Sequence, residues 1–547
     1  RKSIINAIAC FSEQPLISIV MPVFNPSLQF LALAIESVRA QLYENWELCI
    51  ADDASDDNEV RDLIKRYAVA DSRVKYVFRS KNGHISKASN SALTLATGDY
   101  VALLDQDDLL PAHALAYVAE ALNCHPSAAI VYSDEDKVDE TGRRFDPYFK
   151  PDFNWELVLG QNMISHLGVY RRALLNNIGG FRVGVEGSQD WDLALRVVEA
   201  SSPEQIIHIP RVLYHWRAMP GSTAYDNDDK PYAKLAGTRS VEQHLARSNI
   251  IAEVSEAPLA PVFNRVHFAL PDRPPRVSIV IPTRDQYRLL AKCVGSIQAL
   301  SSYEDYELVI VDNGSTCVDT LQYLSELALQ GVKILDCPIP FNYSKLNNLA
   351  VSEAEGEVIC LLNNDIEIIT PDWLEEMVSH ACRPDIGCVG AKLYYPDMSL
   401  QHGGVIVGIG GVAGHFHKHL PGGHAGYFGR AALLQEMTAV TGACLMVRRN
   451  VYEQVGGLNE ELAVAFNDID FCLRVQRHGY RNIWTPFAEC YHHESKSRGA
   501  DTTPQKAARF ELEAQYMRNV WGDALNYDPA YNPNLSLDSA QPQPALA

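Results

Sequence analysis

The sequence predicts an α/β protein made of two tandem domains, each a mostly parallel sheet flanked by helices. Apolar segments of strand length alternate with segments of helical periodicity, a pattern typical of doubly wound parallel sheets. Two more observations support this fold. Several predicted strands end in acidic residues, and the pattern of strands and helices in the first half recurs in the second half. The length of 547 residues agrees with this prediction, because it exceeds one ordinary domain.

The elements of the first half are predicted from the spacing of apolar residues. Short continuous apolar runs indicate buried strands, and apolar positions three and four residues apart indicate helices. The expected strands lie at 16–21, 46–51, 74–78, 129–132 and directly before Asp105, and the expected helices lie at 26–41, 58–70, 86–96 and after Pro111. Pro22 is expected to end the first strand.

The strand before Asp105 stops abruptly in a cluster of carboxylates. Asp105, Asp107 and Asp108 follow an apolar run that begins near Gly98. A buried strand with this ending places carboxylates at the mouth of an open α/β sheet, where such folds bind ligands. Asp105 and Asp107 can together hold a hard divalent cation. The alternative is a polar loop after a core strand.

This pattern returns about 260 residues later, which indicates two homologous domains. The strand sequence at 18–22 recurs at 278–282, and the acidic strand end recurs with Asn363 and Asp365. Prolines cluster at 258–275, as in a linker. The predicted organisation is an N-terminal extension at 1–15, a first domain at 16–257, a linker at 258–275, a second domain at 276–535 and a tail at 536–547. The second domain also carries an insertion in its Gly- and His-rich region, 402–429.

Composition excludes several classes of protein. The net charge of −21 argues against a general nucleic-acid binder, which needs a basic surface. The twelve cysteines form no CxxC pair, which favours buried free thiols in a reducing compartment over a disulfide scaffold or zinc site. No apolar stretch reaches the length of a membrane span. We therefore expect a cytoplasmic protein.

Asp52 and Asp53 follow the second predicted strand, and Asp312 holds the same place in the second half. An acidic residue at such a strand end can accept hydrogen bonds from a nucleobase or a ribose. Alternatively, Asp52 caps the helix that follows. The sequence alone leaves both interpretations open.

Histidine is a candidate for a third metal ligand. His215 closes an apolar strand in the first half, and His492 lies at the same place in the second. A lone histidine is more often structural, but its recurrence in both halves favours a ligand. Histidine together with carboxylates suits Mn²⁺ as well as Mg²⁺.

Asp190 and Asp468 are candidates for a general base. Each lies at the start of an amphipathic helix and belongs to a shared Asp-x-Asp-x-x-x-Arg pattern. The alternative for each is a helix N-cap. Lys496 and Arg498, which follow the second histidine motif, could hold a diphosphate while it departs.

As an ordered set, these motifs resemble the catalytic domain of inverting GT-A glycosyltransferases of family 2. The resemblance covers 16–255 and 276–530, and the second half is similar to rhamnosyltransferase-like enzymes that build bacterial surface polysaccharides. The residues that carry it are 18–22, Asp52, Asp53, Asp105, Asp107, Asp190 and His215, then 278–282, Asp312, Asn363, Asp365, Asp468 and His492.

The resemblance implies a nucleotide-diphosphate sugar as donor and Mn²⁺ or Mg²⁺ as cofactor. It implies donor contacts from Asp52, Asp53, Asp105, Asp312, Asn363, Lys496 and Arg498. The implied metal ligands are Asp105, Asp107, His215, Asp365 and His492. Asp190 and Asp468 would deprotonate the acceptor hydroxyl for in-line attack on the anomeric carbon.

We therefore expect a bifunctional, metal-dependent inverting transferase that extends a bacterial glycan of O-antigen or capsule type. Its partners would be a glycan acceptor, which could be lipid-linked, the inner face of the cytoplasmic membrane and other polysaccharide-assembly proteins. Asn363 departs from the family pattern, so the second metal site would depend on Asp365. The alternatives are one active domain beside a docking or acceptor-binding module, a metal-dependent nucleotidyltransferase, and a carbohydrate-binding scaffold.

Overall fold

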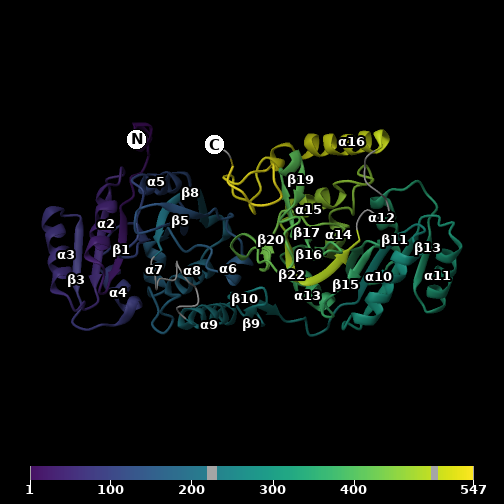
Figure 1. The fold of residues 1–547 in the computed structure, drawn as a ribbon, viewed down its shortest axis with the longest axis horizontal. Coiled ribbons are helices and arrows are strands. Elements are labelled where there is room, and N and C mark those ends of the chain that lie inside the picture. Colours follow the sequence, from purple (N-terminus) through teal and green to yellow (C-terminus); the bar gives the residue numbers. More distant parts are fainter. Residues whose placement is uncertain (1, 219–230, 494–502, 546–547) are drawn as a thin grey trace. The chain divides into compact units, whose positions relative to one another are not determined.

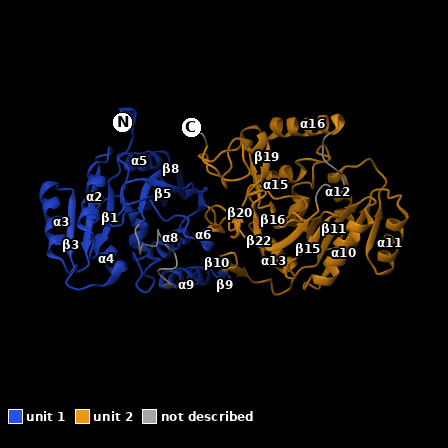
Figure 2. Ribbon diagram, viewed as in Figure 1, with its two compact units in different colours: residues 1–153, 158–256, 262–264 blue, residues 154–157, 257–261, 265–547 orange. Residues whose placement is uncertain are grey.

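The computed structural model describes residues 2–218, 231–493 and 503–545. Its contacts divide the chain into two compact units (Figures 1 and 2). Unit 1 consists of residues 1–153, 158–256 and 262–264, and unit 2 consists of residues 154–157, 257–261 and 265–547. Each unit has its own sheet, as the internal repeat predicts.

Unit 1 is a mixed sheet flanked by helices. Its strands are β1 (Ile17–Val23), β2 (Trp46–Asp52), β3 (Val74–Phe78), β4 (Tyr100–Leu103), β5 (Ile130–Val138), β6 (Arg144–Tyr148), β7 (Gly168–Arg171) and β8 (Ile206–Arg217). Its helices are α1 (Lys2–Ile8), α2 (Leu28–Arg39), α3 (Asn58–Ala70), α4 (His84–Leu93), α5 (Ala114–Cys124), α6 (Leu157–Gly160, whose first residue clusters with unit 2), α7 (Arg172–Asn177), α8 (Gln189–Glu199) and α9 (Pro231–Arg247).

The strand order in unit 1 is β3-β2-β1-β4-β7-β5-β6, and β8 pairs with β5. The first four strands are parallel, whereas β7 runs antiparallel between β4 and β5. β1 continues through Pro22, because its pairing with β2 extends to Val23 opposite Asp52. The carboxyl ends of β1, β2 and β4 therefore lie at one edge of the sheet, where open α/β folds bind ligands.

β5 is longer than the predicted strand at 129–132. It also includes Asp134, Glu135 and Asp136, which lie beyond the predicted end of the strand and are buried within the sheet. Buried carboxylates need partners, and each has one: His208 for Asp134, Lys150 for Glu135 and His215 for Asp136. Tertiary partners on other elements therefore determine the length of this strand.

Unit 2 repeats the arrangement with additional strands. They are β11 (Val277–Thr283), β12 (Tyr306–Asp312), β13 (Lys333–Asp336), β14 (Val358–Leu362), β15 (Ile366–Ile368), β16 (Ile386–Tyr394), β17 (Leu400–His402), β18 (Val405–Val407), β19 (Ala413–His415), β20 (Gln435–Glu436), β21 (Cys444–Arg448) and β22 (Arg481–His492). Its helices are α10 (Tyr287–Leu300), α11 (Val318–Leu329), α12 (Tyr343–Glu353), α13 (Trp373–Ala381), α14 (Arg449–Gln454), α15 (Asn467–Arg477) and α16 (Pro504–Trp521).

The two sheets have matching registers. Val20 of β1 lies opposite Leu103 of β4, and Val280 of β11 lies opposite Leu361 of β14. The main path of the second sheet is β13-β12-β11-β14-β21-β16-β22-β15, with β17 and β20 at its sides. The apolar residues of these strands and of the helices that cover them form one buried core in each unit.

Two segments differ from the predicted organisation. Part of the predicted linker, 258–275, is the strand β10 (Ala260–Phe268), which pairs with β9 (Ala252–Ala257) in a two-stranded sheet. The predicted tail, 536–547, contacts the insertion at 402–429: the backbone N–H of His417 donates to the carbonyl of Ala540 at 2.8 Å.

Two further observations concern the cysteines and the helices. All twelve cysteines are free thiols. Among the described residues, the structure contains no helix with the length and apolarity that crossing a membrane requires.

Candidate active sites

The first candidate residues lie at the carboxyl end of β2. Asp52 is fully buried and accepts hydrogen bonds from the Ser55 backbone N–H at 3.2 Å and from Arg61 Nε at 3.1 Å. The N-cap of α3 is Asp57, so Asp52 does not cap that helix. Asp53 accepts from the Gly83 backbone N–H and from Arg79.

Asp312 holds the same place at the end of β12. It accepts from both the backbone N–H and the hydroxyl of Ser315, at 3.0 and 2.5 Å. Among the described residues, no cation forms an ion pair with it, in contrast to Asp52 with Arg61. The two strand ends therefore share a turn but differ in local charge.

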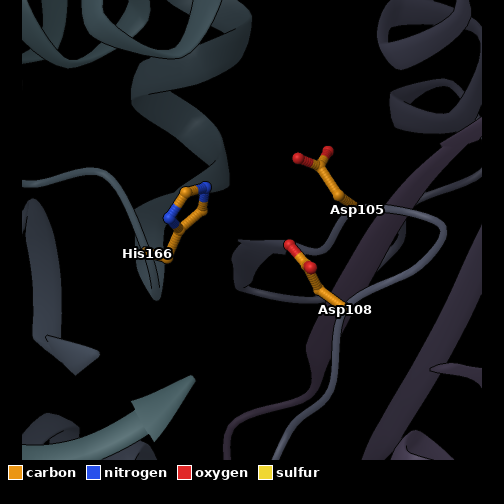
Figure 3. A group of neighbouring side chains, drawn as sticks. All are labelled: Asp105, Asp108 and His166. Carbon is orange, nitrogen blue, oxygen red and sulfur yellow. The ribbon is translucent and has the colours of Figure 1, made fainter. Parts of the chain in front are cut away.

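A group of metal-ligating side chains follows β4. Ligand atoms of Asp105, Asp108 and His166 all lie within 4.8 Å of one another. Figure 3 shows the two carboxylates and the imidazole facing a common space. The sequence predicts Asp105 as a metal ligand, together with Asp107 and His215.

Asp108 is the buried carboxylate of the strand end. It accepts from the Tyr214 hydroxyl at 2.6 Å and from the Arg217 backbone N–H at 2.7 Å. Burial, followed by the charges of Asp107 and Asp105, raises its pKa well above the usual range. The ionised form of Asp108 is therefore disfavoured here, and a bound cation would favour it by offsetting the charges of the neighbouring carboxylates.

His166 is oriented by a buried ion pair. Its Nδ1 lies 3.2 Å from Glu135, and Glu135 accepts from Lys150 Nζ at 3.1 Å. Burial lowers the pKa of His166, but the hydrogen bond and charge of Glu135 and the charges of Asp108 and Asp105 outweigh it and raise the pKa to about 9. The raised pKa favours the protonated ring, which must lose the proton on its other nitrogen before that nitrogen can bind a cation.

His215 lies beside this group but is engaged elsewhere. Its Nδ1 is 2.5 Å from Asp136, and its backbone forms an antiparallel bridge with Leu109, directly after Asp108. The role of ligand that the sequence suggests for His215 stays a prediction, as does that of Asp107.

A chain of hydrogen bonds connects Asp190 to the segment that carries His166. It is the second residue of α8 and accepts from Asn162 Nδ2 at 2.7 Å. Asn162 also accepts from the backbone N–H of Ser165, the residue before His166. The candidate base and the carboxylate–histidine group are therefore joined through residues 162–166.

Unit 2 builds a related group from different segments. His492 Nε2 lies 3.2 Å from Asp365 and 3.4 Å from the side-chain amide of Asn363, and its Nδ1 lies 2.7 Å from Gln401. Ile366 pairs with His492 as Leu109 pairs with His215. By its pairing with the last strand of the sheet, Asp365 therefore corresponds to Asp108 of unit 1. The comparison of sequence motifs instead aligns Asp365 with Asp107.

Asp468 is held at the start of α15 by the turn before β21. Its carboxylate accepts from the Gly442 backbone N–H at 2.9 Å and is hydrogen-bonded to the side chain of Thr441. Burial raises the pKa of Asp468, and these hydrogen bonds oppose the shift. A carboxylate with a raised pKa is better suited to accept a proton near neutral pH.

Lys496 and Arg498, the predicted diphosphate contacts, lie outside the described residues. Sequence reasoning missed His166, which stands alone in an apolar stretch, and it also missed Lys150 and Gln401. The third acidic residue of the strand end was the only signal for Asp108.

Comparisons with known proteins agree with the tandem organisation. A family model described as glycosyl transferase family 2 matches residues 18–179 and 278–456. The chain is 52% identical over 528 residues to the uncharacterized protein y4gI of Sinorhizobium fredii, covering 96% of this chain and 58% of that protein. It is 38% identical over 533 residues to the O-antigen biosynthesis protein RfbC of Myxococcus xanthus, covering 97% of this chain and 41% of that protein.

The chain thus spans about half the length of these curated relatives. Among solved structures, a mannosyltransferase from Pyrobaculum calidifontis in complex with GDP-Man and Mn²⁺ is 17% identical, with a TM-score of 0.35. That match covers 48% of this chain and 69% of that one.

Proposed function

Because the chain belongs to glycosyl transferase family 2, we propose that each unit transfers a sugar from a nucleotide-diphosphate donor to a hydroxyl of a growing bacterial glycan. The observation that carries this proposal is a short chain of contacts in each unit between a candidate base and a carboxylate–histidine group. In unit 1 it runs from Asp190 through Asn162 to Ser165, the chain neighbour of His166. In unit 2 it runs from Asp468 through Thr441 and β17 to His492.

The proposed reaction is a single displacement. The acceptor hydroxyl attacks the anomeric carbon, so that the new glycosidic C–O bond forms while the C–O bond to the diphosphate breaks. Asp190 or Asp468 takes the hydroxyl proton. The nucleoside diphosphate leaves with the electron pair of the broken bond, and the anomeric centre is inverted. Asp52 and Asp312, at the strand ends, bind the nucleotide.

The available side chains fit a divalent metal. Asp105, Asp108 and His166 offer two carboxylate oxygens and one imidazole nitrogen within 4.8 Å, a donor set that suits Mn²⁺ or Mg²⁺. Asp365 and His492 would hold the metal in unit 2. Such a cation neutralises charge on the departing diphosphate.

The substrates are assigned by class. We propose a glycan of O-antigen or capsule type as acceptor, an assignment supported by the similarity to the Myxococcus xanthus protein. The acceptor end could be lipid-linked, which would bring this cytoplasmic enzyme to the inner face of the cytoplasmic membrane and to other polysaccharide-assembly proteins.

The first prediction concerns the two bases. Asp190→Asn and Asp468→Asn should each abolish one transfer step, because an amide cannot take the acceptor proton. We expect at least a 100-fold fall in that step, within the range of general-base contributions. The measurement is nucleoside diphosphate release and product analysis with a panel of donors, with the exposed Asp62→Asn variant as a control.

A normal product pattern in either base variant would contradict two working sites and favour the single-site alternative. The released product also separates the reaction classes. A sugar transferase releases nucleoside diphosphate, whereas a nucleotidyltransferase releases pyrophosphate.

A further inference from the structure

The short strand β17 contacts both halves of the unit 2 site. Gln401 and His402 are adjacent on it, and both are buried, with 3% and 0% of their surface exposed. Successive side chains of a strand point to opposite faces. The two residues can therefore reach different neighbours, His492 for Gln401 and Thr441 for His402.

Gln401 determines which nitrogen of His492 carries the proton. The side-chain oxygen of Gln401 accepts from Nδ1 of His492 at 2.7 Å. Nε2 is then the nitrogen left for a ligand, and it faces Asn363 at 3.4 Å and Asp365 at 3.2 Å. Metal-binding histidines commonly donate their other N–H to such an oxygen, which fixes the ring and its tautomer.

His402 is also held in one tautomer. The Thr441 backbone N–H can only donate, so Nε2 of His402 accepts from it at 3.4 Å. The proton of a neutral His402 is then on Nδ1, which donates to Nδ1 of His415 at 2.9 Å. Burial, with the nearby His415 and His492, lowers the pKa of His402 well below the usual range, in agreement with a neutral ring.

Thr441, which His402 contacts, is also hydrogen-bonded to the candidate base Asp468. Thr441 and Gly442 form the turn that holds the carboxylate of Asp468. His402 fixes the backbone of this turn at Thr441. Displacement of the turn would therefore move the base without removing it.

We infer that Gln401 and His402 are positioning residues of unit 2: Gln401 presents His492 to the metal, and His402 holds the turn that orients Asp468. This inference rests on the proposed function of unit 2. In unit 1, the buried pair Glu135 and Lys150 orients His166 instead.

The test of Gln401 is metal binding by the full chain. The background carries Asp105→Asn and Asp108→Asn, which weaken the unit 1 group. There, Gln401→Leu should weaken Mn²⁺ binding by about 10–100-fold, the usual effect of losing such a partner. Gln401→Glu, which keeps an oxygen acceptor, should retain binding. Electron paramagnetic resonance of free Mn²⁺ measures the affinity, and an unchanged affinity in Gln401→Leu would overturn the role of Gln401.

The test of His402 uses turnover in an Asp190→Asn background. His402→Leu should lower kcat at least 10-fold while the KM for the donor stays unchanged, because only the base is displaced. His402→Gln should restore kcat, since a carboxamide can both accept from Thr441 and donate to His415. The exposed His419→Gln variant is the matched control. A normal kcat in His402→Leu, or no rescue by glutamine, would refute the role of His402.

A spectroscopic measurement separates this inference from the proposed function. In ¹⁵N-histidine-labelled protein, the nitrogen chemical shifts of His402 and His492 should report protonation at Nδ1. If the wild-type chain transfers no sugar, the proposed function fails. The tautomers and Mn²⁺ binding then still decide the two positioning roles, and protonation at Nε2 of either ring would overturn the corresponding role.

Discussion

At the scale of single residues, buried charges beside the sites depend on specific partners. Lys150 is fully buried, and its Nζ donates to Glu135 and to the backbone carbonyls of Ile164 and His166. Burial raises the pKa of Glu135, but the charge of Lys150 and the contact with His166 outweigh it and lower the pKa far below its usual range. Lys150 and His166 thus stabilise the ionised Glu135 carboxylate together, and that carboxylate in turn orients His166.

Replacing that cation should be costly. Lys150→Met breaks a buried ion pair and leaves His166 as the remaining charged partner of Glu135, so we expect the free energy of unfolding of unit 1 to fall by about 3–5 kcal/mol. Urea unfolding followed by circular dichroism measures this change. The control is Lys65→Met, which removes an exposed ion pair with Asp62 and should cost less than about 1 kcal/mol. Equal losses in the two variants would contradict the argument.

The sequence was informative for residues at strand ends and helix starts. The end of an apolar strand marks Asp105 and Asp365, and the start of an amphipathic helix marks Asp190 and Asp468. His166 has no such mark, because its place depends on contacts with Glu135, Asp105 and Asp108 that no local pattern encodes. The predicted strand at 129–132 is shorter than β5 for the same reason, because the acidic residues of β5 have their partners on other elements.

At the scale of elements, α16 supports the start of α15. Glu513 of α16 is buried and accepts from the backbone N–H groups of Val464 and Ala465, at 2.9 and 3.0 Å. Trp521 Nε1 donates to Asp470 at 2.9 Å. This helix therefore holds both the loop before Asp468 and the helix that carries it.

Loss of the Glu513 carboxylate should lower the free energy of unfolding of unit 2. Glu513→Leu leaves two backbone donors without their partner, so we expect about 1–3 kcal/mol of destabilisation of unit 2. Glu511→Leu, on the exposed side of the same helix, is the matched control. Thermal unfolding measures the difference, and a Glu513→Leu variant as stable as the control would refute the supporting role of α16.

A second element makes the stability of unit 2 depend on pH. Glu376 of α13 is buried and accepts from Thr485 and Arg265 and contacts His380. Burial raises its pKa, but His380, Arg265 and Thr485 outweigh it and lower the pKa from 4.5 to about 2. Protons therefore bind the unfolded state more readily between these values.

The sign of the resulting pH dependence is fixed by that shift. The stability that Glu376 contributes is fully present above pH 4.5 and is lost as the pH falls towards about 2. Glu376→Gln should weaken this loss, giving a shallower acid dependence together with a less stable protein at pH 7. Unfolding free energies from pH 7 to pH 2 measure the dependence, and an unchanged slope in the variant would contradict the assignment.

At the scale of the whole molecule, two units of one ancestry carry two candidate sites. Chelation should stop both transfer steps, because a divalent cation bound by each proposed site would neutralise charge on the departing diphosphate. Nucleoside diphosphate release before and after EDTA, and after adding back Mn²⁺ or Mg²⁺, measures the dependence. Glycan binding that survives chelation without donor consumption would favour the carbohydrate-binding scaffold.

The domain pattern was predictable at this scale because a repeated sequence is visible without any structure. Local irregularities were not: β10 lies inside the Pro-rich segment because its pairing with β9 outweighs composition. Likewise, the C-terminal segment packs on the insertion through backbone hydrogen bonds, which have no signature in side-chain type.

The different origins of the two histidines have a consequence for hybrids of the two units. His166 precedes β7, whereas its counterpart before β21 is Ala443, and unit 2 instead takes His492 from its final strand. The two candidate metal-binding histidines are therefore not at equivalent positions of the repeat. A hybrid that joins the first part of one unit to the last strand of the other would therefore carry either both His166 and His492, or Ala443 together with His215, and neither combination matches a native site.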